Sequence, residues 1–291
     1  MHRNSPQVLS SPRTRSPRAH SATVPRGGPT RREGRPQGAA HVVALHASAS
    51  SGRQWQALQS QLADGYLVLS PDLYGSGDSP PWPPGRGLTL ADEVALLEPV
   101  FEAAGGPFHL IGHSYGGAVA ARAALTYPGC CRSLVLIEPV LFGLLVAEDP
   151  HQPAAREVVA VCQHTGAAVE VGALDSAAQR FIDYWMGTGT WAGTPPQRRA
   201  AIAAAMPGVR NQWTAIFAET TPLAAYSLLD LPVLYLEGTE SPSSTRAVAR
   251  LLTQALPNVT SAELNGAGHM APLTHAGLVN AAIKEYLQRI G

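Results

Sequence analysis

From residue 41 onward, short runs of apolar and β-branched residues alternate with longer stretches in which apolar residues recur at helical spacing. The apolar runs predict strands at 41–45, 66–70, 107–112, 133–138, 232–236 and 260–264. The stretches between them predict helices at 52–63, 89–104, 115–127, 244–255 and 275–289. Strands that alternate with helices are typical of a mainly parallel sheet with helices on both faces, so we predict an α/β fold.

The alternation stops between residues 142 and 228. This stretch carries helical patterns at 154–164, 175–186, 196–206 and 210–219, separated by glycine- and proline-rich segments. A helical insertion between two core strands lies over the carboxyl ends of the strands, where open α/β sheets bind their ligands. We therefore predict a core of residues 41–141 and 229–291, with a helical cap of residues 142–228 inserted between core strands.

Residues 1–40 have a different composition from the rest. They hold eight arginines and one acidic residue, Glu33, so this extension carries a charge of +7 and the remainder −7, while the whole chain is neutral. The extension is rich in serine, proline and glycine and has no periodic apolar pattern, so we expect it to be disordered. Its basic run would suit nucleic acid or anionic lipid, whereas a solvated extension or a misassigned translation start is the simpler interpretation.

The overall composition fits one large core with an insertion, because the chain has 291 residues of which 45% are hydrophobic. The three cysteines, Cys130, Cys131 and Cys162, are too few for a disulfide framework, and their spacing offers no metal site. No apolar run approaches the ~18–20 residues that span a membrane, and no apolar export segment follows Arg31-Arg32. We therefore expect a cytoplasmic protein without a membrane partner.

The segment Gly112-His113-Ser114-Tyr115-Gly116 lies between a predicted strand and a predicted helix. A serine in a tight strand-to-helix turn between small residues is the setting of a nucleophile elbow. Glycines leave room where the strand and helix meet, and the start of the helix directs free N–H groups at the group under attack. We therefore predict Ser114 as a nucleophile, with His113 packed under the turn.

Four further segments support this interpretation. They are Leu45-His46-Ala47-Ser48-Ala49-Ser50, Pro71-Asp72-Leu73-Tyr74-Gly75-Ser76-Gly77-Asp78-Ser79, Pro232-Val233-Leu234-Tyr235-Leu236-Glu237-Gly238 and Gly266-Ala267-Gly268-His269. Together with the elbow, and in this order, they resemble the motifs of the α/β-hydrolase fold superfamily over roughly residues 41–290. The resemblance implies an α/β-hydrolase sheet with a helical cap and the chemistry of a serine hydrolase.

The resemblance also assigns roles to individual residues. A serine hydroxyl is a poor nucleophile near neutral pH, so it needs a base within hydrogen-bonding reach, and His269 is the candidate. The oxyanion of the intermediate needs preorganised donors, and the backbone N–H groups of Tyr115 and Ser48 (or Ala47) are the natural pair. His46 is expected to orient the loop that carries the second donor.

The acid of the triad has two candidates, because the residue at the usual position is not acidic. The family places this residue three positions beyond a glycine after the cap, which here leads from Gly238 to Ser241, with Glu240 one residue earlier. Some branches of the family instead carry a glutamate at the end of the strand before the cap, where this chain has Glu138. Because a charged residue that ends a buried strand is costly unless it is paired, we favour Glu138 over Glu240.

A second departure concerns the start of the sheet. The family normally forms two strands before the loop of His46, and residues 1–40 do not supply them. We therefore expect either a sheet that lacks two edge strands or a misassigned start of the coding sequence.

These observations predict a cofactor-free serine hydrolase that forms an acyl-enzyme on a small apolar or aromatic carboxylic ester. Aromatic residues in the cap segment suggest an apolar pocket, although packing between cap helices explains them equally well. Hydrolysis of a lactone or a C–C bond, or acyl transfer, would use the same site. A non-catalytic ligand-binding relative would keep the fold without turnover.

The expected partner is a small molecule. The absence of a basic groove in residues 41–291 argues against nucleic acid, and no metal or other cofactor is expected. A monomer or a homodimer fits the sequence equally well, and the physiological substrate stays open.

Overall fold

The computed structural model describes residues 39–291, so the disordered extension predicted at the amino terminus lies almost wholly outside the described residues. Six parallel strands form one sheet in the order β2-β1-β3-β4-β5-β6. They are β1 (Ala40–Leu45), β2 (Tyr66–Leu69), β3 (Phe108–His113), β4 (Cys131–Ile137), β5 (Val233–Gly238) and β6 (Val259–Leu264). Each begins and ends within two residues of its predicted bounds, which confirms the prediction of a mainly parallel α/β sheet.

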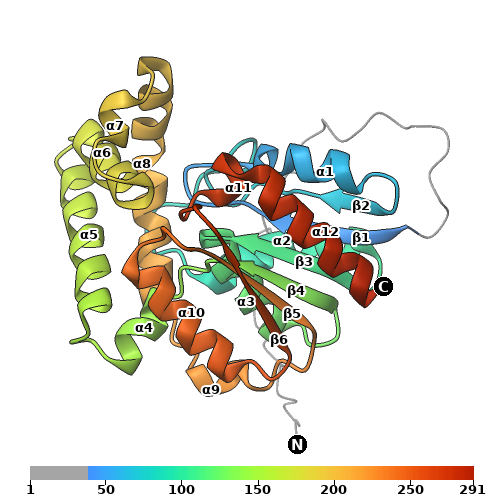
Figure 1. The fold of residues 1–291 in the computed structure, drawn as a ribbon. Helices are drawn as coiled ribbons and strands as arrows, with labels where there is room; N and C mark the ends of the chain where they lie inside the picture. The colour runs from blue at the N-terminus through green and yellow to red at the C-terminus, as the bar shows by residue number, and fades with distance from the viewer. Residues whose placement is uncertain (1–38) are drawn as a thin grey trace, which may run out of the picture.

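Helices cover both faces of this sheet (Figure 1). The core helices are η1 (Gly52–Trp55), a 3₁₀ turn that leads into α1 (Gln56–Leu62), then α2 (Leu90–Ala104), α3 (Tyr115–Thr126), α10 (Ser243–Ala255), α11 (Ala271–Thr274) and α12 (Ala276–Ile290). Buried side chains of α1 and α12 share one apolar cluster, and those of α2, α3 and α10 share the other.

The strands explain why both faces need a cover. Along β4, Leu134 and Leu136 belong to one apolar cluster, whereas Val135 and Ile137 belong to the other. Successive side chains of a strand point to opposite faces, so a strand that is apolar at every position must be buried on both sides. The unbroken apolar runs of the sequence therefore specify a central sheet between two helical layers.

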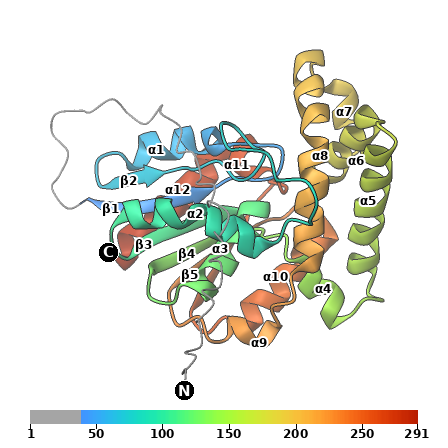
Figure 2. The ribbon, with the colours of Figure 1, turned by 180° about the vertical axis from the view of Figure 1, so that it is seen from behind.

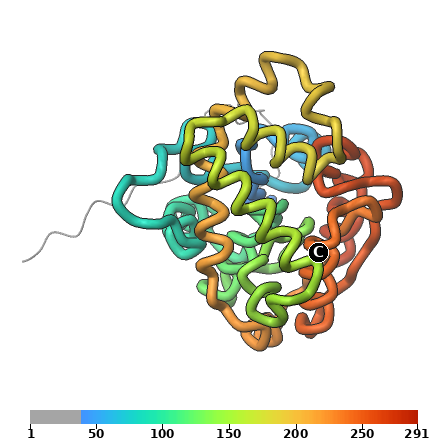
Figure 3. The backbone as a smooth tube through the Cα atoms, turned by 90° about the vertical axis from the view of Figure 1, so that its left-hand side faces the viewer, coloured from blue at the N-terminus to red at the C-terminus, as the bar shows by residue number. Residues whose placement is uncertain are grey.

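Between β4 and β5 the chain forms helices and, within the described residues, no strand. We call this segment the helical insertion; it comprises α4 (Phe142–Glu148), α5 (Pro153–Glu170), α6 (Leu174–Met186), α7 (Thr190–Gly193), α8 (Pro196–Ala218) and α9 (Leu223–Tyr226). Helices α5 to α8 stand together beside the core in Figures 1 and 2, and Figure 3 views the molecule from their side.

The predicted break between helices at 196–206 and 210–219 is wrong, because α8 runs unbroken through Pro207. A proline inside a helix removes a hydrogen bond and strains the preceding turn, at a cost of about 3 kcal/mol. Met206, Val209 and Trp213 bury their side chains on either side of it, and this packing keeps the helix continuous.

Among the described residues, no helix combines the length and the apolar character that a membrane crossing requires.

Candidate active site

Ser114 lies in the tight turn between the end of β3 and the start of α3, with a backbone φ of 56°. Two glycines make this turn possible. A Cβ atom at Gly112 would lie 2.3 Å from the carbonyl oxygen of Gly116, and one at Gly116 would lie 2.5 Å from the carbonyl oxygen of His46. The strand and helix therefore approach more closely than any side chain would permit, and Ser114 occupies the apex of an elbow.

The structure brings Ser114, His269 and Glu138 together in a line. His269 follows β6, and its Nε2 lies 2.9 Å from Oγ of Ser114. Its Nδ1 lies 2.6 Å from Oε2 of Glu138, the residue that directly follows β4. Ser114 is 5% exposed, and His269 and Glu138 are each 1% exposed, so all three residues are almost completely shielded from bulk water.

Glu138 is held as a carboxylate although it is buried. Its second oxygen, Oε1, accepts hydrogen bonds from the backbone N–H of Gly238 at 2.6 Å and from the hydroxyl of Ser241 at 2.5 Å. Burial raises the pKa of Glu138, but the bond to His269 and these two donors outweigh it and hold the pKa below its ordinary value. Glu240, the other candidate acid, has an exposed side chain, and Glu138 occupies Nδ1 of His269.

The loop predicted to carry the second oxyanion donor, residues 46–50, follows β1, and we call it the oxyanion loop. The N–H of Ala47 donates to Oε1 of Gln54 at 3.1 Å, so this donor is already used. Tyr115 is the first residue of α3, where backbone N–H groups have no partner within the helix. Ser48 borders a cavity beside the site, so of the two residues predicted in this loop we keep Ser48 as the second donor.

His46 and Asp72 hold the oxyanion loop in place. Nδ1 of His46 lies 2.8 Å from the carbonyl oxygen of Ala47, and its Nε2 accepts the N–H of Leu73 at 3.0 Å. Burial lowers the pKa of His46, which keeps the ring neutral with its proton on Nδ1. Oδ1 of Asp72 accepts the N–H of Gly52 at 2.8 Å, so the Pro71-Asp72 motif supports the loop from below.

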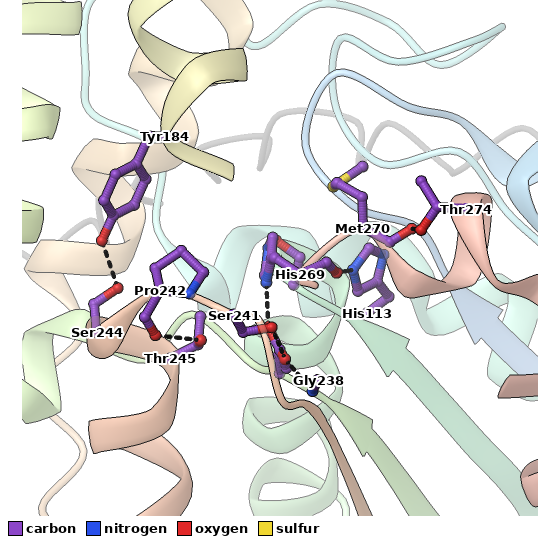
Figure 4. A network of polar contacts seen from close by, with 12 residues as sticks. His113, Tyr184, Gly238, Ser241, Pro242, Ser244, Thr245, His269, Met270 and Thr274 are labelled. Carbon is purple, nitrogen blue, oxygen red and sulfur yellow. Dashed lines mark hydrogen bonds and ion pairs between the residues drawn. The ribbon is translucent and has the colours of Figure 1, made fainter. Parts of the chain in front are cut away.

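Sequence reasoning missed Gln54, which connects the oxyanion loop to the loop that carries His269, between β6 and α11. Nε2 of His113 lies 2.8 Å from the carbonyl oxygen of His269 (Figure 4). Nδ1 of His113 lies 3.1 Å from Nε2 of Gln54. A carbonyl only accepts, so Nε2 of His113 carries the proton, its Nδ1 accepts from Gln54, and the Oε1 of Gln54 faces Ala47. Burial lowers the pKa of His113 to about 3, which is consistent with this neutral ring.

The helical insertion meets the site through Trp185 of α6. Its ring lies 4.0 Å from the ring of His269, centroid to centroid, with an angle of 28° between the planes. A cavity of about 640 Å³ opens between the oxyanion loop and α6 to α8. Its lining is largely apolar and includes Ser48, Phe181, Ile182, Trp185, Ile202 and Met270. The insertion thus supplies both a ring over the histidine and one wall of an adjoining cavity.

The cysteines take no part in this arrangement. Cys130, Cys131 and Cys162 are unpaired, and none of them contacts Ser114 or His269 in the hydrogen bonds described above. In the part of the chain that the structure describes, no group of three or more histidine, cysteine or carboxylate side chains is placed to hold a metal ion.

Comparisons with known proteins identify the family and the fold of the chain. Residues 40–276 match the family described as alpha/beta hydrolase fold. Over 186 residues the chain is 33% identical to lipase LipV of Mycobacterium tuberculosis, an alignment that covers 61% of this chain and 63% of that lipase. It is 25% identical to a pimeloyl-[acyl-carrier protein] methyl ester esterase of Chromobacterium violaceum, over 85% of this chain and 94% of that protein.

Solved structures show the same fold at lower identity. A thermophilic esterase from Thermogutta terrifontis superposes with a TM-score of 0.66 at 23% identity, over 86% of this chain and 90% of its own. The chain spans less than two thirds of the length of LipV, so this match by itself assigns no activity. On the family match and the shared fold, the chain belongs to the α/β-hydrolase fold family.

Proposed function

We propose that this chain is a cofactor-free serine hydrolase that cleaves a carboxylic ester through Ser114, His269 and Glu138. The observation that carries the proposal is the continuous line of hydrogen bonds from Oγ of Ser114 through His269 to Glu138. An ester is favoured as the substrate because two proteins with similar sequences are named a lipase and a methyl ester esterase.

The reaction follows from the placement of these groups. Nε2 of His269 accepts the hydroxyl proton of Ser114 while Oγ attacks the ester carbonyl carbon. The carbonyl oxygen becomes an oxyanion, which the backbone N–H groups of Tyr115 and Ser48 stabilise. Glu138 keeps the proton of His269 on Nδ1 and balances the positive charge that the imidazole gains.

The second half of the reaction reverses these proton transfers. His269 gives its proton to the leaving alkoxide, the C–O bond breaks, and the acyl group remains on Ser114. A water molecule then loses a proton to His269 and attacks the acyl carbon. The bond between that carbon and Oγ of Ser114 breaks, His269 returns the proton to Oγ, and the carboxylic acid is released.

The cavity beside Ser48 supports a small apolar or aromatic ester as the substrate. Its volume of about 640 Å³ lies in the usual range for small-molecule sites, and its lining is largely apolar. The helical insertion forms one wall of this cavity, which is the role of a cap.

Short-chain p-nitrophenyl esters test the proposal directly. We expect turnover by the unchanged protein and a loss of nearly all of it in Ser114→Ala and His269→Ala. Unchanged turnover in Ser114→Ala would overturn the mechanism, and ester binding without turnover in the unchanged protein would instead support a non-catalytic ligand-binding role.

The acid is tested by a matched pair. Glu138→Gln is expected to lower kcat by about 10²–10⁴-fold, as in other serine triads that lose their acid, whereas Glu240→Gln is expected to leave kcat unchanged. A loss confined to Glu240→Gln would transfer the role of the acid to that residue.

A further inference from the structure

Ser241 follows β5, and its hydroxyl contacts Glu138, which follows the neighbouring strand β4. Its Oγ lies 2.5 Å from Oε1 of Glu138, and the residue is 8% exposed. A hydroxyl has one proton to donate and a carboxylate only accepts, so the proton of Ser241 is committed to Glu138.

The contacts of Glu138 divide between its two oxygens. Oε2 receives the proton on Nδ1 of His269, whereas Oε1 receives the backbone N–H of Gly238 and the hydroxyl of Ser241. Within residues 39–291, Ser241 and His269 are the side chains that hydrogen-bond to this carboxylate. A buried carboxylate oxygen that loses a donor is costly, so the two donors on Oε1 fix the orientation in which the other oxygen faces His269.

The backbone after β5 places Ser241 at this point. The N–H of Ser241 donates to the carbonyl oxygen of Gly238 at 3.2 Å, which closes a turn and brings the hydroxyl back over the strand end. A Cβ atom at Gly238 would lie 2.9 Å from Oγ of Ser241, so the glycine leaves room for the approach. Figure 4 shows Gly238 and Ser241 gathered beneath His269, with His113 beside it.

We propose that Ser241 is a positioning residue, which holds Oε1 of Glu138 so that Oε2 stays directed at Nδ1 of His269. The proposal rests on the function proposed above, because it concerns the acid of the same triad. It assigns a role to a residue that supplies no group to the substrate and acts through Glu138 alone.

The test compares pH profiles of kcat/KM for Ser241→Ala and the unchanged protein. When the carboxylate loses a donor, it binds the protonated imidazole more tightly, so the acid limb is expected to move to higher pH by about half to one unit. Ser241→Thr keeps the hydroxyl and is expected to restore the original midpoint. Ser241 borders an open hollow beside Pro153 and Arg246, which leaves room for the added methyl group.

A control must remove a similar hydroxyl without touching Glu138. Ser244 is fully buried, lies in α10 and bonds to the hydroxyl of Tyr184 at 2.7 Å. Ser244→Ala is expected to leave the midpoint of the acid limb in place. The other titratable groups within reach of the charge on Glu138 are His113, Tyr235 and Glu237, which are the same in every variant.

Two further readouts separate this inference from the proposed function. The proton between Nδ1 of His269 and Glu138 gives a downfield NMR signal without substrate, assigned by its loss in Glu138→Gln, and Ser241→Ala is expected to move it further downfield. Ser241→Ala is also expected to change kcat little when Glu138 is already glutamine, because its effect passes through the carboxylate.

The outcomes decide between the two claims. If the unchanged protein cleaves no ester, the proposed function fails, while the NMR signal still tests Ser241. If esters are cleaved with dependence on Ser114 but the acid limb and the NMR signal are the same in Ser241→Ala and Ser241→Thr, the positioning role is overturned.

Discussion

At the scale of single residues, the site uses backbone conformations that ordinary residues avoid. Among the described residues, the non-glycine positions with positive φ are Ala49, Ser114 and Glu138, at 54°, 56° and 44°. All three lie in the proposed oxyanion loop or the proposed triad. Each such conformation costs on the order of 1–3 kcal/mol and persists only where the surroundings hold it, as the bond from the N–H of Glu138 to the carbonyl oxygen of Leu236 does here.

A second buried carboxyl lies behind the nucleophile. Glu93 of α2 is fully buried, and its oxygens accept the hydroxyl of Tyr115 at 3.0 Å and the N–H of Tyr74 at 3.1 Å. Burial raises its pKa to about 7, and the two donors offset only part of that rise. The folded state therefore binds this proton more tightly than the unfolded chain does.

The raised pKa of Glu93 makes stability depend on pH. The stabilisation by its proton is complete below the unfolded pKa near 4.3 and is lost as the pH rises towards 7, which amounts to about 3 kcal/mol. Glu93→Gln carries no such proton. We therefore expect the free energy of unfolding of Glu93→Gln, relative to the unchanged protein, to rise by this amount between pH 4 and pH 8 in urea titrations.

The matched control is Glu102→Gln, which makes the same change on the exposed side of α2. Its stability relative to the unchanged protein is expected to stay level over the same pH range. If the free energy of unfolding of Glu93→Gln, relative to the unchanged protein, also stayed constant with pH, Glu93 would titrate like an exposed glutamate and the prediction would be wrong.

The residues of the site differed in how far the sequence could reveal them. Ser114 and His269 stand in local motifs that encode their own surroundings, so their meeting at 2.9 Å was foreseeable. Glu138 was favoured because a charge that ends an apolar strand needs a partner. The contacts of Gln54 and Ser241 join positions far apart in the chain, and no local pattern encodes them.

At the scale of elements, the site depends on two parallel strands that end side by side. Ile137 of β4 is in register with Leu236 of β5, so the segments that follow both strands reach the same point beneath His269. We therefore expect a carboxylate placed after either strand to reach Nδ1 of His269. The present chain uses the end of β4 for the acid and the turn after β5 for its hydroxyl partner.

Exchanging these two side chains tests whether the strand ends are equivalent. Glu138→Ser is expected to lower kcat by about 10²–10⁴-fold, and adding Ser241→Asp is expected to recover at least tenfold of that loss, measured with p-nitrophenyl esters. Glu240, the residue before Ser241, is present in both variants. Any recovery in the double variant therefore requires the carboxylate at position 241 itself and not merely one near it in sequence. No recovery in the double variant would show that the strand ends are not interchangeable.

The 3₁₀ turn η1 contributes Gln54, which bridges two loops. Its amide accepts from Ala47 in the oxyanion loop and donates to His113, which in turn holds the carbonyl oxygen of His269. Gln54→Leu keeps the volume and removes both bonds. We expect kcat to fall about thirtyfold with little change in KM, because two hydrogen bonds of about 1 kcal/mol each position groups that act in the transition state.

The control for this prediction is Gln59→Leu in α1. Gln59 is also part-buried and bonds to Ser70 at 3.2 Å, but it touches neither loop. Both variants are expected to lose similar stability in thermal unfolding. Equal losses of kcat in the two would mean that Gln54 matters only for folding.

At the scale of the whole molecule, the core and the helical insertion meet over the triad. The strands and core helices were predictable because each carries its own periodicity, which the sheet then satisfies on both faces. The packing of the insertion against the core was not predictable from the sequence. Aromatic residues such as Phe142, Trp185 and Trp213 are equally suited to a ligand pocket or to packing between helices. The structure shows Trp185 and Trp213 each stacked on Phe142, with Trp185 also lying against His269.

Trp185 is therefore expected to limit what reaches Ser114. The indole is 5% exposed and lies against His269, so its removal frees space next to the nucleophile. We expect Trp185→Ala to raise kcat/KM for bulky p-nitrophenyl esters relative to the acetate by about tenfold, since one buried aromatic side chain covers about 150–250 Å². Trp185→Phe is expected to give an intermediate ratio, because a smaller ring closes part of the space.

Trp191→Ala is the matched control, since it removes the same side chain from α7 of the insertion, where Trp191 is also buried and lies near Arg199. Its ratio of bulky to small esters is expected to match that of the unchanged protein. If Trp185→Ala and Trp191→Ala shift the ratio equally, loosening of the insertion as a whole explains selectivity. A shift confined to Trp185 would show that the insertion acts on the chemistry through the one ring that it places on the histidine.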